Sequence, residues 1–211
     1  MTNDPHAGGR VLSAGKPLAQ ADGAVILLHG RGGSADDILS LAGPMNAPNL
    51  AFLAPEAAGN TWYPNSFLAS REVNEPWLSS ALNRIATLIA ETGLPPERIV
   101  LGGFSQGACL ASTFVASHPA RYAGMIALTG GIAGPIGTRF SYSGDLGGMP
   151  ALLLSGVPDP HIPWERVEET AAVLTGMGAK VTLRKYPGRP HTVSMDEIEL
   201  AHELFAAAFP L

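Results

Sequence analysis

One short segment of the chain carries a serine between two glycines at the spacing that serine nucleophiles use. Gly103, Ser105 and Gly107 form the pattern G-x-S-x-G. At a sharp turn between a strand and a helix, this pattern exposes the serine Oγ for attack on a carbonyl carbon. Side chains in place of the glycines would collide in such a turn, and the helix N-terminus adds positive charge beside a developing oxyanion. The alternative interpretation is a glycine-rich turn whose serine only caps the helix.

A nucleophilic serine needs a base that accepts its proton and an acid that orients the base. His191 lies in a loop between a predicted strand and a predicted helix, and Asp159 directly follows another predicted strand. Pro158 and Pro160 stiffen the loop that carries this carboxylate. Proteins with such an elbow carry their triad in the order serine, acid, histidine. We therefore predict Ser105 as nucleophile, His191 as base and Asp159 as acid.

The other titratable residues fit these roles less well. His29 precedes the serine, and His161 follows Asp159 almost directly, as a partly exposed loop histidine. Asp145 lies before the strand that Asp159 follows, and Asp196 begins the last predicted helix. For His191 itself, the alternative is an ordinary surface histidine.

A second glycine-rich turn, at 29–33, ends the first predicted strand. The backbone N–H groups of Arg31 and Gln106 are predicted to form an oxyanion hole, in which each donor contributes about 3 kcal/mol. A phosphate-binding loop is the competing interpretation, but the motifs G-x-G-x-x-G and G-K-[ST] are both missing. The sequence offers no metal-binding motif, so we expect neither a metal nor a cofactor.

Alternating strands and helices must position these residues. Apolar runs predict strands at 24–29, 50–54, 98–104, 124–128, 151–155 and 180–186. Helices are predicted at 34–41, from Pro76 to Gly93, and at 106–117, 163–175 and 194–208. This order indicates an α/β fold with a mostly parallel sheet covered on both faces, whose ligands bind at the carboxyl ends of the strands. We expect a single domain at 21–211, after an N-terminal tail and lead-in at 1–20 that includes His6.

Composition limits the classes of function. With 211 residues, 46% hydrophobic and 15% charged, the chain can bury a full core. A net charge of −5 without a basic run argues against nucleic acid. Cys109 is the only cysteine, so no intrachain disulfide forms, and its predicted place is in the core. The start of the chain lacks the apolar core of a signal peptide, and no apolar run approaches ~20 residues. A cytoplasmic protein without membrane insertion is the expectation.

An aromatic pair marks the expected substrate pocket. Trp62 and Tyr63 lie in the loop after the strand 50–54, where their rings could contact an acyl group. Alternatively, Trp62 fixes the loop against the core. The segment 129–150 is glycine-rich and too short for a cap domain, so we expect an open site that prefers short to medium acyl chains.

Together these motifs resemble the phospholipase/carboxylesterase family. The resemblance rests on 28–32 (LHGRG), 103–107 (GFSQG), Asp159-Pro160 and His191, and covers about Val25 to Ile198. It implies a compact, lidless α/β-hydrolase with Ser105, Asp159 and His191 as its triad. The family includes acyl-protein thioesterases and bacterial carboxylesterases.

The chain departs from the family at two positions beside the triad. Ser155 stands where the family often has histidine, and Pro190 where it usually has glycine. Neither residue reacts, so these departures affect the choice of substrate more than catalysis. Segments 60–64 and 74–77 resemble a bacterial branch. Dienelactone hydrolases share the fold but use a cysteine nucleophile, against which Ser105 argues.

The main hypothesis is therefore a serine carboxylesterase acting on a small-molecule ester, possible as a homodimer. A thioesterase acting on acyl thioesters or S-acyl proteins is the first alternative, because the same acyl-enzyme serves both. A catalytically silent binding protein on a hydrolase scaffold is the second.

Overall fold

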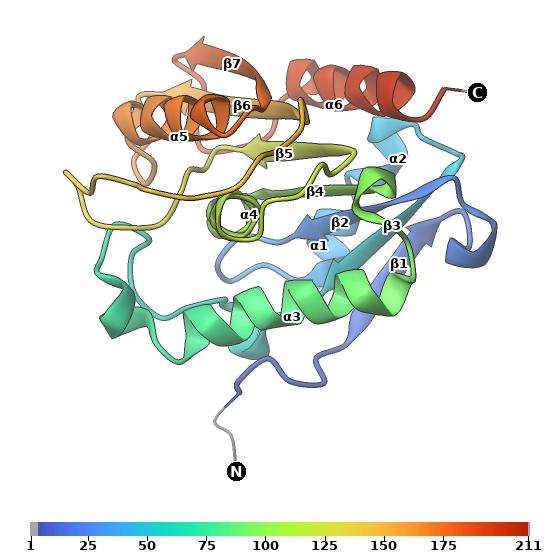
Figure 1. The fold of residues 1–211 in the computed structure, drawn as a ribbon, viewed down its shortest axis with the longest axis horizontal. Helices are drawn as coiled ribbons and strands as arrows, with labels where there is room; N and C mark the ends of the chain where they lie inside the picture. The colour runs from blue at the N-terminus through green and yellow to red at the C-terminus, as the bar shows by residue number, and fades with distance from the viewer. Residues whose placement is uncertain (1–3, 211) are drawn as a thin grey trace.

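A seven-stranded sheet runs through the centre of the computed structural model, which describes residues 4–210 (Figure 1). The strands follow the spatial order β1-β3-β2-β4-β5-β6-β7. Their bounds are β1 Val11–Gly15, β2 Gly23–Leu28, β3 Leu50–Pro55, β4 Ile99–Phe104, β5 Gly124–Leu128, β6 Pro150–Val157 and β7 Lys180–Pro187. Every neighbouring pair is parallel except β1 and β3, which are antiparallel. The six predicted strands and the mostly parallel sheet are confirmed, with small differences at the strand ends.

Helices cover both faces of the sheet. Their bounds are α1 Ala35–Leu39, α2 Ala42–Met45, α3 Trp77–Thr92, α4 Gln106–Ser117, α5 Trp164–Gly176 and α6 Met195–Ala208. Ile26 and Leu28 of the central strand β2 belong to the core that includes side chains of α3, α4 and α5. Val25 and Leu27 belong to the core on the other face, which includes side chains of α1, α2 and α6. This explains the continuous apolar run of β2, because alternate side chains meet a core on each face. Among the described helices, none has the length and apolarity needed to cross a bilayer.

The helix ends follow the local chemistry of the sequence. Ser34 forms a capping box with Asp37 at the start of α1, and Ser194 forms one with Glu197 at the start of α6. Gly93 ends α3 in the left-handed conformation with φ 65°. The 129–149 connection between β5 and β6 contains no helix or strand, so no separate cap lies over the sheet.

The N-terminal segment differs from the predicted tail and lead-in at 1–20. Val11–Gly15 forms the edge strand β1, which pairs along β3 from Val11↔Pro55 to Gly15↔Ala51. His6, expected in the tail, is buried. The prediction missed β1 because an edge strand buries few side chains and therefore shows little apolar pattern. Residues 1–3 and 211 of the predicted segments lie outside the described residues, and the boundary at residue 21 separates β1 from the strand it pairs with.

Candidate active site

The serine lies on a strained turn between β4 and α4. Ser105 has φ 55° and ψ −116°, a conformation that residues other than glycine rarely adopt. Its backbone N–H donates to the Leu128 carbonyl of β5 at 3.0 Å, which holds the turn against the sheet. A Cβ at Gly107 would lie 2.0 Å from the Leu28 carbonyl oxygen, and one at Gly103 would lie 2.6 Å from the same atom. A Cβ at Gly103 would also lie 2.6 Å from the carbonyl carbon of Gly107, so the glycines are required both by the backbone of β2 and by the backbone of the turn itself.

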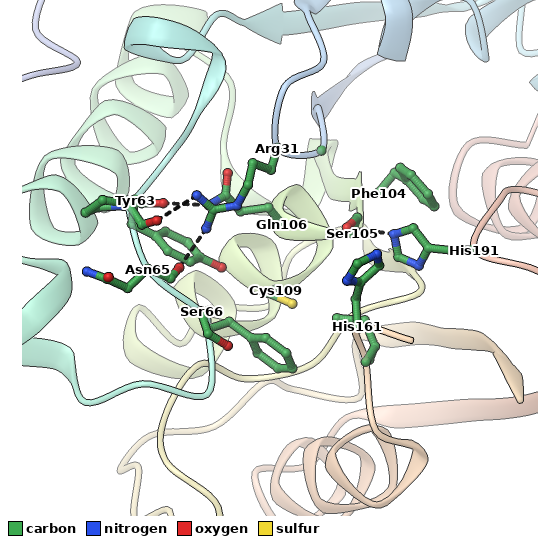
Figure 2. Close-up of a pocket in the computed structure, with 14 residues that line it drawn as sticks. Arg31, Tyr63, Asn65, Ser66, Phe104, Ser105, Gln106, Cys109, His161 and His191 are labelled. Carbon is green, nitrogen blue, oxygen red and sulfur yellow. Dashed lines mark hydrogen bonds between the residues drawn. The ribbon is translucent and has the colours of Figure 1, made fainter. Parts of the chain in front are cut away.

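The serine, histidine and aspartate form one hydrogen-bonded chain. His191 Nε2 lies 2.9 Å from Ser105 Oγ (Figure 2), and His191 Nδ1 lies 2.7 Å from Asp159 Oδ2. The Asp159 side chain is 0% exposed, while that of His191 is 19% exposed. The geometry brings together all three residues that the sequence selected. It leaves Asp145 elsewhere, bonded to the backbone N–H of Gly147.

The environment of Asp159 keeps its carboxylate ionised. Burial raises the pKa of Asp159, but hydrogen bonds from His191 and from the backbone N–H groups of His161 and Ile162 outweigh burial and hold the pKa below its ordinary value. Each of these two N–H groups donates to Oδ1 at 2.9 Å. An ionised Asp159 requires the proton of the neutral imidazole to be on Nδ1, which leaves Nε2 free to accept the serine proton.

Loops at the carboxyl ends of four strands supply the site. Ser105 follows β4, Asp159 follows β6, His191 follows β7, and Arg31 follows β2. Because parallel strands place these ends along one edge of the sheet, residues far apart in the chain meet there.

Two backbone N–H groups beside Ser105 are available as oxyanion donors. Within residues 4–210, neither the Arg31 nor the Gln106 N–H donates a hydrogen bond, and both residues line the same pocket as Ser105. The N–H groups that follow Arg31 are occupied, since Gly32 donates to Asn60 at 2.7 Å and Gly33 donates to Gly30 at 3.1 Å. These bonds shape the turn and leave the Arg31 N–H unpaired.

The side chain of Arg31 holds the loop after β3, a role that the sequence did not indicate. Its Nη1 donates to Thr61 Oγ1 at 3.1 Å and to the Pro64 carbonyl at 2.8 Å. Its Nη2 donates to the Asn65 carbonyl at 2.6 Å (Figure 2). The guanidinium group also lies over the Tyr63 ring, 5.9 Å from the centroid. The residue whose backbone N–H is predicted to be an oxyanion donor therefore also fixes one wall of the pocket with its side chain.

The side chain of Gln106 fixes the same loop from the elbow. Its Oε1 accepts from the Trp62 backbone N–H at 3.0 Å, and its Nε2 donates to the Tyr63 carbonyl at 2.8 Å. These contacts join residues far apart in the chain, so neither spacing nor periodicity in the sequence could reveal them.

A cavity of about 610 Å³ opens beside Ser105 (Figure 2). Its lining comprises Gly30, Arg31, Tyr63, Pro64, Asn65, Ser66, Phe67, Phe104, Ser105, Gln106, Cys109, His161, Ile162 and His191. Tyr63 lies in this lining, where the sequence predicted an aromatic residue. His161, which from the sequence is expected to be an ordinary loop histidine, also lines the cavity, with its ring edge-on to that of His191 at 4.9 Å between centroids. Its position next to Asp159 was the available indication.

The position of Trp62 differs from the one predicted for a substrate contact. The side chain is 0% exposed and does not line the cavity. Its Nε1 donates to the His29 carbonyl at 2.9 Å, and its ring packs between those of His6 and His29, with centroids 5.4 and 5.1 Å away. The expectation that Trp62 contacts substrate is wrong, because its indole fills the core beneath the loop. The alternative, in which it fixes the loop, describes the structure.

A buried ion pair joins the loop that carries His191 to the start of α6. Arg189 Nη2 lies 3.2 Å from Glu197 Oε1, with side chains 10% and 0% exposed, and donates to Thr129 Oγ1 at 2.9 Å. Burial raises the pKa of Glu197, while hydrogen bonds from Ser194 and the charge of Arg189 act in the opposite direction. Arg189 thereby links the histidine loop to the end of β5 and the start of α6.

Gly156 lets this loop approach β6. A Cβ at Gly156 would lie 2.4 Å from the Arg189 carbonyl oxygen, so any other residue would displace the loop. The departures from the family pattern, Ser155 and Pro190, are the chain neighbours of Gly156 and Arg189.

The sheet with helices on both faces, and the serine elbow at the carboxyl edge, define an α/β-hydrolase. The sequence pattern of the phospholipase/carboxylesterase family matches residues 10–207. The chain belongs to this family, and the resemblance predicted from the sequence is confirmed.

Individual relatives agree with this assignment. Acyl-protein thioesterase 1 homolog 1 of Dictyostelium discoideum is 28% identical over 92% of this chain and 94% of its own. A phospholipase/carboxylesterase structure from Dyadobacter fermentans is 42% identical, covers 94% of this chain and 96% of that one, and superposes with a TM-score of 0.89. The carboxylesterase of Bacillus cereus, at 23% identity, shares the fold with a TM-score of 0.75 over 96% of both chains. The chain is thus an enzyme of the serine hydrolase class, whose relatives are carboxylesterases and thioesterases.

Proposed function

We propose that this enzyme is a carboxylesterase that works through an acyl-enzyme on Ser105. The observation that carries the proposal is the continuous chain from Ser105 Oγ to His191 Nε2 at 2.9 Å and from His191 Nδ1 to Asp159 at 2.7 Å. As Oγ attacks the ester carbonyl carbon, His191 takes the serine proton and the carbonyl oxygen becomes an oxyanion. The N–H groups of Arg31 and Gln106 stabilise this oxyanion.

The second half of the cycle reverses the proton transfer. When the tetrahedral intermediate collapses, the C–O bond of the ester breaks and His191 delivers its proton to the departing alcohol oxygen. Water then attacks the acyl-enzyme while His191 accepts a proton from the water. As this second tetrahedral intermediate collapses, the bond from the acyl carbon to Ser105 Oγ breaks, His191 returns the proton to Oγ, and the carboxylic acid is released. Asp159 remains ionised throughout and stabilises the imidazolium in both steps.

The cavity supports a preference for short to medium acyl chains. Its volume of about 610 Å³ is bounded by Tyr63, Phe67 and Ile162, with Cys109 also in its lining. Each buried methylene contributes about 0.8 kcal/mol, so binding improves until the chain extends beyond this wall. Burial raises the pKa of the Cys109 thiol to about 12. The thiol therefore stays protonated and does not compete with Ser105 as nucleophile.

A thioester substrate is the second candidate. The acyl-protein thioesterase among the relatives favours it, and the same acyl-enzyme would form from either substrate. The intact hydrogen-bonded chain argues against a silent binding protein, because loss of activity on such scaffolds usually removes a triad residue.

Paired substrates test the proposal. The purified enzyme is assayed with acetate, butyrate, octanoate and palmitate esters of one alcohol, and with thioesters of the same acids. We expect hydrolysis of the shorter esters, a decline towards palmitate, and complete loss in Ser105→Ala. Hydrolysis of every ester by Ser105→Ala at the wild-type rate would reject the mechanism, and a strong preference for the thioesters would replace ester with thioester as the substrate class.

The partner, the cellular location and the oligomeric state of the enzyme remain predictions. We expect a small-molecule ester as its partner and the cytoplasm as its location. A homodimer also stays a prediction, which the mass of the protein in solution would decide.

A further inference from the structure

A second groove meets the catalytic site beside the glycine-rich turn at 29–33. It encloses about 400 Å³ and shares Gly30, Arg31, Phe104 and His191 with the first cavity. The rest of its lining is His29, Gly33, Asp37, Ile38, Leu41, Thr192 and Val193, which come from the β2 end, α1 and its following turn, and the loop after His191. The two spaces therefore meet beside the base.

The reaction requires two binding regions that diverge from Ser105. The alcohol oxygen receives its proton from His191, so the alcohol has to leave along the His191 side of the site. The larger cavity extends from Ser105 towards Tyr63 and Asn65, whereas Phe104 lies on the opposite side of Ser105, beside His191 (Figure 2). This arrangement assigns the larger cavity to the acyl group and the second groove to the alcohol.

The walls of the groove are mainly apolar. Ile38 is buried, Leu41 and Val193 are half-buried, and the Phe104 ring lies 4.9 Å from the His191 ring between centroids. Such walls favour an alkyl alcohol over a strongly hydrated one. The face of Phe104 also provides the negative quadrupole that attracts ammonium groups.

One carboxylate lies in this apolar lining. Asp37 is exposed, and its Oδ2 accepts from the N–H and Oγ of Ser34, both at 2.8 Å, which fixes the carboxylate beside the groove. Arg31 also lines both spaces, but its guanidinium group bonds to Thr61, Pro64 and Asn65 on the acyl side. The two sides of the site thus carry opposite charges.

We propose that this groove binds the alcohol part of the ester, and that Asp37 makes it prefer an alkylammonium alcohol over a neutral alcohol of the same shape. The proposal rests on the proposed esterase function and names the substrate class of that site. Because Asp37 is exposed, water screens part of its attraction, so the preference is a matter of several-fold rather than of orders of magnitude.

Two acetates of the same shape test the proposal. Acetylcholine, the acetate ester of choline, carries a quaternary nitrogen where 3,3-dimethylbutyl acetate carries a carbon, and the acyl groups are identical. The ratio of kcat/KM for acetylcholine to kcat/KM for 3,3-dimethylbutyl acetate is measured in wild type, Asp37→Asn and Asp36→Asn. Asparagine keeps the acceptor for Ser34, and Asp36 is a matched control on the same helix that does not line the groove.

The expected result is a ratio that falls about three- to tenfold in Asp37→Asn and stays at the wild-type value in Asp36→Asn. Equal ratios in all three proteins, or equal falls in both variants, would overturn the proposal. If the esters are hydrolysed with Ser105 dependence and the ratio does not respond, the groove assignment fails while the esterase function stands. If no ester is hydrolysed at all, the esterase function fails as well.

A second variant tests the groove without its charge. Val193→Phe narrows the groove, so kcat/KM for 3,3-dimethylbutyl acetate should fall severalfold relative to methyl acetate. Methyl acetate and methyl butyrate differ only in the acyl chain, so the ratio of their kcat/KM values should stay at the wild-type value. A change in the acyl ratio with no change in the alcohol ratio would show that the groove holds the acyl group instead.

Discussion

Replacing Arg189 with methionine should destabilise the enzyme strongly, because it leaves a buried carboxylate without its cation. Glu197 is 0% exposed and lies 3.2 Å from Arg189. Removing one partner of a buried ion pair costs about 3–5 kcal/mol, and loss of the hydrogen bond to Thr129 adds about 1 kcal/mol. Methionine recovers some packing, so we expect a net loss of about 4 kcal/mol in the free energy of unfolding. In a chain of this size, that lowers Tm by about 8–16 °C.

The loss should depend on pH in a definite direction. Burial raises the pKa of Glu197 above its ordinary value, and removing the nearby charge of Arg189 raises it further. A carboxyl group with a raised pKa takes up its proton in the folded state before the unfolded state does as the pH falls. The folded state of Arg189→Met therefore recovers stability towards acidic pH, and its deficit relative to wild type is smaller at about pH 5 than at about pH 8.

Urea unfolding of both proteins at the two pH values measures this effect. Arg184→Met is the matched control, since it removes the same charge from an exposed position on β7. Glu197→Gln should show a smaller loss, because the amide keeps an acceptor for Ser194 and leaves no buried negative charge. The reasoning is refuted if Arg189→Met loses no more than Arg184→Met, or if its deficit is the same at both pH values.

Three further predictions concern the acid of the triad, the buried Trp62 and the buried histidines beside it. Asp159→Asn should lower kcat by about 10⁴ by favouring the wrong imidazole tautomer, whereas Asp145→Asn and Asp196→Asn should change kcat little; a larger effect of Asp145→Asn would assign the acid elsewhere. Trp62→Phe should lower the free energy of unfolding by about 1–3 kcal/mol, because the His29 carbonyl loses its donor; a raised KM with unchanged stability would restore Trp62 as a substrate contact. Burial lowers the pKa values of His6 and His29, so the unfolded chain binds more protons near about pH 6 and stability falls as the pH drops from about 7.5 to 5. His6→Phe should lose less stability over that range than wild type, and equal slopes in urea unfolding would contradict the buried, neutral state of His6.

The features that the sequence predicted well are those with a local physical cause. The central strand β2 is apolar at every position because both of its faces are covered, and α3 ends at Gly93 because glycine accepts a positive φ. The elbow is local too, since Gly103, Ser105 and Gly107 lie within one turn. Chain order and the parallel sheet then placed Asp159 and His191 beside Ser105.

The features that the sequence did not reveal depend on contacts between distant segments. β1 forms by pairing with the edge of β3, and its own side chains are too little buried to produce an apolar pattern in the sequence. Trp62 lies among turn-forming residues, a sequence context typical of a surface aromatic residue. In the fold it is buried, because its Nε1 donates to the His29 carbonyl and its ring packs against the buried ring of His6. An arginine in a loop, such as Arg189, has the sequence context of a solvated charge, and only the fold shows that it pairs with the buried Glu197.

The central claim, that Ser105 becomes acylated through the geometry of its elbow and base, is tested most directly by labelling with a fluorophosphonate probe. The intact mass of the labelled protein counts the adducts, and the mass of its proteolytic peptides locates them. The account predicts one adduct per chain on the peptide that contains Ser105, none in Ser105→Ala, and much slower labelling in His191→Ala, whose serine has lost its base. An adduct that persists in Ser105→Ala, or that maps to another residue in wild type, would contradict the account.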